Sequence, residues 1–144
     1  MTVLAANTAR KVRNTKRRLM GKYPVKGSTL IYAGALVCVA ADGYAVNAAD
    51  TAGLKCVGIC KKKVDNSAGA DGAKTVEVYY GHEELFTVAA GITVADIHAQ
   101  ACVVDNDSLT DAAAATNDVE VGDIVEVPAS GTAWVAVCVA SANA

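Results

Sequence analysis

Residues 35–46 read Ala-Leu-Val-Cys-Val-Ala-Ala-Asp-Gly-Tyr-Ala-Val, and this stretch carries the clearest local fold signal in the chain. Asp-Gly suits a two-residue turn between antiparallel strands, because that turn needs positive φ angles that Gly, and to a lesser degree Asp, adopt readily. Here Asp42-Gly43 separates the apolar triplets Val37–Val39 and Tyr44–Val46. The stretch therefore predicts a β-hairpin.

Short Val-rich runs broken by Gly, Asp and Asn continue outward from this hairpin, beginning at Ser28. They predict further strands at residues 29–32, 54–64, 74–80, 84–89, 101–104, 124–127 and 132–139. About nine short strands at this spacing predict an all-β fold, a small β-sandwich or barrel. One short helix is expected from Thr93 to Ala99, because Thr93 and Asp96 have the spacing of a capping box.

Charge is divided unevenly along the chain. Eight Lys and Arg residues lie in the first 26 positions, and the first carboxylate is Asp42. Fifteen acids then follow against five further cations, so residues 1–41 carry +8 and residues 42–144 carry −10. This division predicts an extended basic N-terminal arm over residues 1–27 and a β-rich domain over residues 28–144. The candidate binding residues of the arm are Arg10, Lys11, Arg13, Lys16, Arg17, Arg18 and Lys22.

Three interpretations of the arm remain open. It could bind an acidic protein surface, it could bind nucleic acid through salt-sensitive phosphate contacts, or it could be a solvated tail. The acidic domain argues against nucleic acid, since phosphate would repel it, and Tyr23 is the only aromatic residue of the arm that could stack on bases. The acidic protein surface is therefore the favoured partner.

The composition indicates a thin core. The chain contains 29 Ala and 21 Val but only one Trp and one Phe, so each buried side chain removes little area from water. We expect a single 144-residue domain with an appendage, whose stability is completed by assembly with copies of itself, as a homodimer or homotrimer, or with a larger surface.

No motif for catalysis or metal binding is recognisable. His82 and His98 do not neighbour a Ser or Cys in a nucleophile motif, and we interpret both as structural, at the surface or at a helix end. Asp105, Asp107 and Asp111 have part of the spacing of a calcium loop, but its turn glycine and bidentate glutamate are missing. The sequence predicts no enzyme, no cofactor and no metal.

The cysteines and the apolar runs restrict the location. The five cysteines are widely spaced in Val-rich runs and predict reduced, buried thiols, with Cys56 and Cys60 on one face of a strand. No apolar run approaches the ~20 residues that span a bilayer, and no apolar segment of a signal peptide follows the basic N-terminus. We expect a protein made in the cytoplasm and not inserted in a membrane.

Several stretches follow one another in a characteristic order: residues 26–37, Cys56–Ile59, Ala90–Ile97 (Ala-Gly-Ile-Thr-Val-Ala-Asp-Ile), Val103–Asp107, Val121–Val127 and Thr132–Val135. In their residues and their order they resemble the capsid decoration (cement) proteins of tailed bacteriophages. The resemblance implies a β-rich structural protein on the outer capsid surface of the virion, which binds the major capsid protein and stabilises the shell. The basic arm would then staple capsid subunits together without covalent bonds. The alternative is a nucleic-acid-associated virion protein that uses the same arm.

Overall fold

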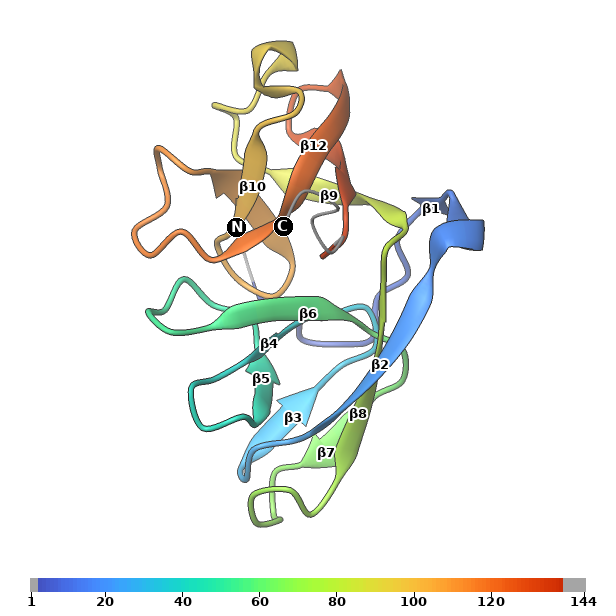
Figure 1. Cartoon of the computed structure of the whole chain (residues 1–144), viewed down its shortest axis with the longest axis vertical. Helices are drawn as coiled ribbons and strands as arrows, with labels where there is room; N and C mark the ends of the chain where they lie inside the picture. The colour runs from blue at the N-terminus through green and yellow to red at the C-terminus, as the bar shows by residue number, and fades with distance from the viewer. Residues whose placement is uncertain (1–2, 139–144) are drawn as a thin grey trace.

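The computed structural model describes residues 3–138, and in that range the fold is all-β (Figure 1). The strands are β1 (Val12–Arg13), β2 (Leu19–Pro24), β3 (Thr29–Ile31), β4 (Leu36–Val39), β5 (Ala45–Asn47), β6 (Lys55–Cys60), β7 (Val64–Asn66), β8 (Thr75–Tyr80), β9 (Glu83–Val88), β10 (Gln100–Val103), β11 (Ser108–Asp111), β12 (Glu120–Ala129) and β13 (Thr132–Ala136). The helical turns of these residues are two 3-10 segments, η1 (Thr15–Arg17) and η2 (Val94–Asp96). The expected all-β class is confirmed, but residues 3–138 alone form thirteen strands where about nine were expected.

Five strands close into a ring. β9, β11, β10, β12 and β13 follow one another by hydrogen bonding, and β13 pairs with both β12 and β9. The β11–β9 pairing is parallel, and the others are antiparallel. β1 adds to the edge of β9 at Val12 and Arg13. We call this ring the C-terminal barrel.

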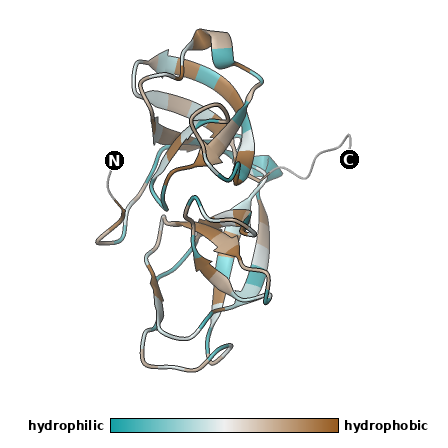
Figure 2. Ribbon diagram, turned by 90° about the vertical axis from the view of Figure 1, so that its left-hand side faces the viewer, coloured by the Kyte–Doolittle hydropathy of each residue, from teal (hydrophilic) through white to brown (hydrophobic). Residues whose placement is uncertain are grey.

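The other main sheet has the strand order β2-β8-β6-β4-β5. Just after β2, Val25 forms a parallel bridge with Ala45 of β5, and the Lys26 N–H donates to the Ala45 carbonyl at 3.0 Å. These contacts bring the two ends of the sheet together. We call it the N-terminal sheet; β3 and β7 pair beside it. The barrel and the sheet stack along the long axis of the molecule (Figures 1 and 2).

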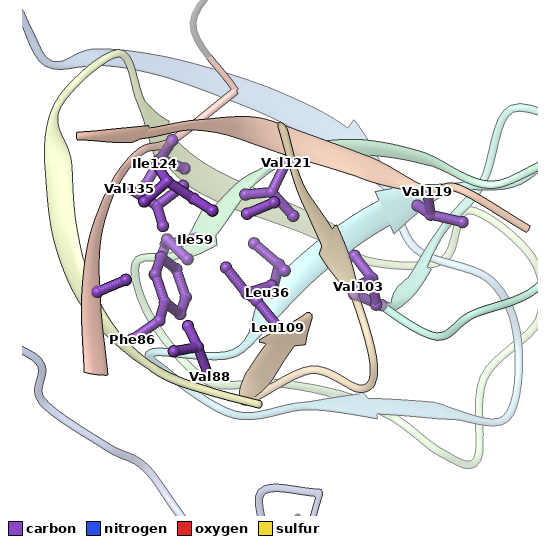
Figure 3. Packing of buried hydrophobic residues seen from close by; sticks show 14 of the residues in the cluster. Leu36, Ile59, Phe86, Val88, Val103, Leu109, Val119, Val121, Ile124 and Val135 are labelled. Carbon is purple, nitrogen blue, oxygen red and sulfur yellow. The ribbon is translucent and has the colours of Figure 1, made fainter. Parts of the chain in front are cut away.

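Strand β4 lies between two hydrophobic cores. Leu36 and Cys38 point into the large core, where Leu36 packs with Phe86 and Ile124 of the C-terminal barrel (Figure 3). Val37 belongs to the smaller core inside the N-terminal sheet. Leu36, Val37 and Cys38 are fully buried, and Val39 is half-buried. A strand covered on both faces needs apolar side chains at every position, which explains why Leu-Val-Cys-Val does not alternate with polar residues.

A bulge in β6 overturns the prediction that Cys56 and Cys60 share a face. Val37 of β4 pairs with Gly58, whereas Cys38 pairs with Cys56, so one residue of β6 is left unpaired. An extra residue inverts the alternation of side chains beyond it. Cys56 therefore packs against the large core and Cys60 lies in the smaller one.

The basic N-terminal segment is built into the fold. β2 pairs with β8 over six residues, from Leu19 opposite Tyr80 to Pro24 opposite Thr75, and β1 pairs with β9. The structure thus differs from the expected division at residue 27: within the described range, the sheets begin at Val12. The physical reason is that β2 supplies the edge strand that covers β8.

Candidate cationic interface

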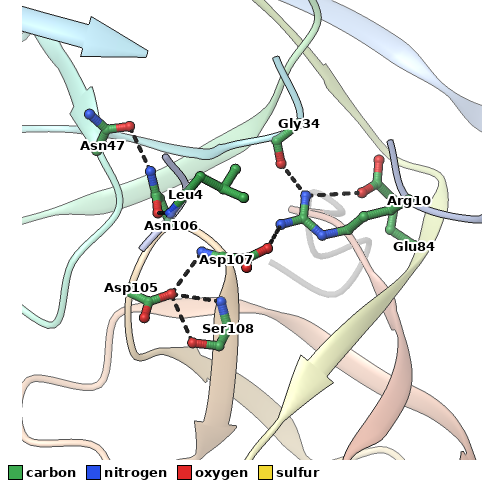
Figure 4. A network of polar contacts seen from close by, with 9 residues as sticks. All are labelled: Leu4, Arg10, Gly34, Asn47, Glu84, Asp105, Asn106, Asp107 and Ser108. Atoms are coloured by element: carbon green, nitrogen blue, oxygen red, sulfur yellow. Dashed lines mark hydrogen bonds and ion pairs between the residues drawn. The ribbon is translucent and has the colours of Figure 1, made fainter. Parts of the chain in front are cut away.

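Arg10 is turned inward and holds the N-terminal segment against both halves of the molecule (Figure 4). Its guanidinium group donates to the Gly34 carbonyl and to the Asp107 carboxylate, and lies 4.0 Å from Glu84 Oε2. It also lies over the Phe86 ring, 4.9 Å from the centroid. Only 7% of the Arg10 side chain is exposed, so this cation is unavailable to a partner.

Arg13 makes a second internal contact of the same kind. Its Nε lies 2.6 Å from Glu83 Oε1 and its terminal nitrogen lies 2.9 Å from Glu126 Oε1. The guanidinium group stacks over the Trp134 ring at 4.2 Å, which joins β1 to β9, β12 and β13. Burial lowers the Arg13 pKa, but hydrogen bonds to Glu126 and Glu83 outweigh burial and raise it. Arg13 is therefore a fixed cation of the barrel surface.

The acidic partner of these two arginines is the chain's own C-terminal half. Residues 81–138 contain no Lys or Arg. Their ten acids are Glu83, Glu84, Asp96, Asp105, Asp107, Asp111, Asp118, Glu120, Asp123 and Glu126. The N-terminal segment thus neutralises part of a −10 region of the same molecule. The uneven charge along the sequence is explained in part by this internal pairing.

The remaining arm residues point outward. Lys11, Lys16, Arg17, Arg18 and Lys22 are exposed, and among residues 3–138 none of them has a carboxylate oxygen within 4.0 Å. Lys16 and Arg17 lie on η1, and Lys22 lies on β2. The expected set of seven therefore divides into two internal arginines and five outward cations.

The outer surface of β2 and β8 gathers cations around an aromatic ring. Arg18 lies over the Tyr79 ring at 4.0 Å, and Lys61 Nζ lies 5.7 Å from the same ring. Lys61 Nζ is also 3.9 Å from Met20 Sδ and 3.8 Å from Glu77 Oε2. We call this surface the β2–β8 face; its members are Arg18, Met20, Lys22, Lys61, Glu77 and Tyr79.

Apolar side chains accompany this charge. Leu19 is 57% exposed and Met20 is 54% exposed, at the start of an edge strand. Met20 lies on the β2–β8 face, whereas Leu19, the preceding residue of the strand, points to the other side of the sheet. A surface that combines an exposed Arg, a Met and an aromatic ring has residue types that are enriched in protein-binding surfaces. Met20, Lys61 and Tyr79 were not among the expected binding residues, because residues 19–24 were not expected to form a strand. The alternation of residues 74–80 does indicate that Glu77 and Tyr79 share a face.

The two histidines differ from each other. His82 is fully buried, and its Nε2 lies 2.7 Å from Glu84 Oε1. The expectation that His82 lies at the surface or at a helix end is therefore wrong: it lies between β8 and β9, with its side chain covered. His98 is exposed, and its backbone N–H donates to the Ile124 carbonyl at 2.7 Å.

Asp105 and Asp111, which have part of the spacing of a calcium loop, accept hydrogen bonds from residues of their own turns. Asp105 Oδ1 accepts from the Asp107 N–H, the Ser108 N–H and the Ser108 hydroxyl, each at 2.8 Å. Asp111 Oδ1 accepts from the Ala114 N–H at 3.0 Å. Within residues 3–138, no group of three or more His, Cys, Asp or Glu side chains is placed to hold a metal ion.

In the described part of the chain, no helix has the length and apolar character needed to cross a membrane. No protein-family model matches the chain. No curated protein matches it either.

Proposed function

We propose that this chain is a non-catalytic structural protein that binds the outside of a phage capsid and stabilises the shell of major capsid protein. The β2–β8 face is the observation that carries the proposal, because it presents exposed cations, the exposed side chain of Met20 and the Tyr79 ring together. The resemblance to capsid decoration proteins, through stretches such as Ala90–Ile97, supports the choice of partner. Copies on the particle would form homodimers or homotrimers.

The binding cations would be held on an ordered surface and not on a disordered arm. Arg10 and Arg13 fix the N-terminal segment to the barrel, so Arg18 and Lys22 are presented by an ordered turn and strand. A rigid surface loses less conformational entropy on binding than a disordered arm does. Carboxylates of neighbouring capsid subunits would meet this surface and bridge across it, with Met20 adding apolar contact.

The test is attachment to empty heads of the phage that encodes the chain, measured by co-sedimentation. The variant carries Arg18→Glu and Lys22→Glu of the β2–β8 face and Lys16→Glu of the η1 turn that precedes it. A matched control carries Lys55→Glu, Lys62→Glu and Lys74→Glu, which are exposed cations outside the β2–β8 face and change the net charge equally. We expect the first variant to lose occupancy by more than about tenfold and the control to retain it, since reversing a charge at an interface creates repulsion.

Equal occupancy of the two variants would show that the β2–β8 face is not the attachment surface. Attachment should also weaken between low salt and molar salt, because exposed ion pairs are screened. Occupancy that does not change across this range would leave only the apolar groups as the anchor.

Nucleic acid is the alternative ligand of the same cations. Duplex DNA bound to a filter at physiological salt distinguishes the two proposals. We expect no retention of DNA, since the region from residue 81 to residue 138 carries ten carboxylates and no Lys or Arg. Retention that disappears in the Lys16, Arg18 and Lys22 variant would favour the nucleic-acid alternative.

A further inference from the structure

Two thiols from distant parts of the chain meet where the N-terminal sheet contacts the C-terminal barrel. The Sγ atoms of Cys56 and Cys138 lie 2.8 Å apart, although 82 residues separate them in the sequence. Cys56 belongs to β6, and Cys138 follows the end of β13. The Cys138 N–H donates to the Val121 carbonyl at 2.7 Å, which fixes its backbone beside β12.

The two thiols differ from the other three in their surroundings. Cys38, Cys60 and Cys102 are buried, whereas Cys56 and Cys138 are partly exposed. Both partly exposed cysteines line a groove of about 590 Å³, together with Arg17, Gln100 and Gly122. A small oxidant in solution can therefore approach Cys138 from the groove.

A third thiol lies close by but is protected. Cys38 pairs in register with Cys56 across β4 and β6, and it is fully buried. Its hydrogen bond with Cys56, followed by burial, raises the pKa of Cys38 strongly. Thiolate and access are both needed for reaction with an oxidant, so Cys38 is the less reactive neighbour.

We propose that Cys56 and Cys138 form an oxidation site that closes into a disulfide on reaction with a low-molecular-weight disulfide. The Cys138 thiolate attacks one sulfur of the oxidant, whose S–S bond breaks and releases one thiol after protonation. The Cys56 thiol loses its proton, and its thiolate attacks the Cys138 sulfur of the mixed disulfide and releases the second thiol. In sum, two protein thiols lose two protons and two electrons, and the oxidant disulfide is reduced to two thiols.

Closure would join β6 of the N-terminal sheet to the end of β13 in the C-terminal barrel. It would therefore lock the two halves of the molecule together and restrict the unfolded chain over a long loop. Although the residue Cys56 is partly exposed, its thiol group is surrounded by protein, and this burial raises the pKa of the thiol, so the closing step should accelerate as pH rises. The geometry brings the sulfur atoms together before oxidation, so little rearrangement is needed.

The test treats the full-length chain with oxidised glutathione and follows the intact mass and the melting temperature. We expect a loss of two hydrogen masses and a rise in melting temperature of about 10 °C, both reversed by dithiothreitol. The variant Cys138→Ser should show neither change, and the control Cys60→Ser should show both. Retention of all five thiols, or glutathione that stays attached to Cys138, would refute the site.

Trypsin identifies the linked residues. In a chain with Cys60→Ala and Cys102→Ala, the sequence places Cys38 in residues 27–55, Cys56 in residues 56–61 and Cys138 in residues 75–144. We expect the second and third peptides to be joined until reduction. A link between residues 27–55 and residues 56–61 would instead assign the bond to Cys38 and overturn the proposal.

Discussion

Replacing Arg10 with Met should destabilise the protein more than any single change among the outward cations. Met keeps the unbranched apolar stem that packs near Phe86 but removes the guanidinium group. The change deletes the hydrogen bonds to Gly34 and Asp107 and leaves Glu84 with only its contact to His82.

The expected loss follows from the burial of these groups. Breaking a buried ion pair by removing one partner costs about 3–5 kcal/mol. The Glu84 side chain is 6% exposed, but the Asp107 side chain is 33% exposed and can regain water. We therefore take the lower end, about 3 kcal/mol, which corresponds to a fall in melting temperature of roughly 10 °C for a domain of this size.

Thermal and urea denaturation of Arg10→Met and Lys16→Met provide the comparison. Lys16 is exposed and unpaired among the described residues, so its replacement should change the free energy of unfolding by less than about 0.5 kcal/mol. The double variant Arg10→Met, Asp107→Asn should lose less than the sum of the single losses, because the amide that replaces the carboxylate carries no charge that needs a partner. Equal stability of the two Met variants would refute the reasoning that Arg10 holds the segment in place.

Three further results are expected. Gly34→Ala should lower the free energy of unfolding more than Gly43→Ala, which should lower it by about 1 kcal/mol. Both glycines have positive φ, but only at Gly34 would the new Cβ meet the Thr8 carbonyl. Urea midpoints measure the difference. Backbone hydrogen bonds from Thr116 and Asn117 lower the Asp50 pKa, so Asp50 should stabilise the fold above pH ~4 and lose this effect as pH falls through its folded pKa. The difference in unfolding free energy between the unchanged protein and Asp50→Asn, measured by denaturation at several pH values, should therefore shrink in acid. A difference that stays constant with pH would contradict this. Leu36→Ala should cost about 3 kcal/mol with one cooperative transition, since Leu36 is fully buried in the core that joins the sheet and the barrel; a separate transition for the barrel would contradict it.

Much of the β architecture could be predicted from local signals. The hairpin at Asp42-Gly43 joins β4 and β5, and the run from Lys74 to Tyr80 forms β8. The capping box at Thr93 is present: its N–H donates to Asp96 Oδ2 at 2.8 Å, although the turn is 3-10 and not a longer helix. These features depend on neighbouring residues, so the sequence pattern is sufficient to find them.

Features that depend on distant residues were not predictable. β2 carries Gly21, Lys22 and Pro24, which disfavour a strand locally, and it forms because β8 pairs with it. Gly122 disfavours a strand locally, but it lies within β12, where the close approach of the Ala136 carbonyl leaves no room for a side chain. The partner of Arg10 could not be identified either, since Asp107 is 97 positions away.

The internal pairing of the N-terminal segment has a consequence for biogenesis. Arg10 and Arg13 find their partners at Asp107 and Glu126, which are synthesised 97 and 113 positions later. Residues 10–13 therefore cannot dock until the nascent chain has emerged beyond Glu126. Such high contact order predicts slow folding and a newly made chain whose positive leader is briefly free to bind other anions in the cell.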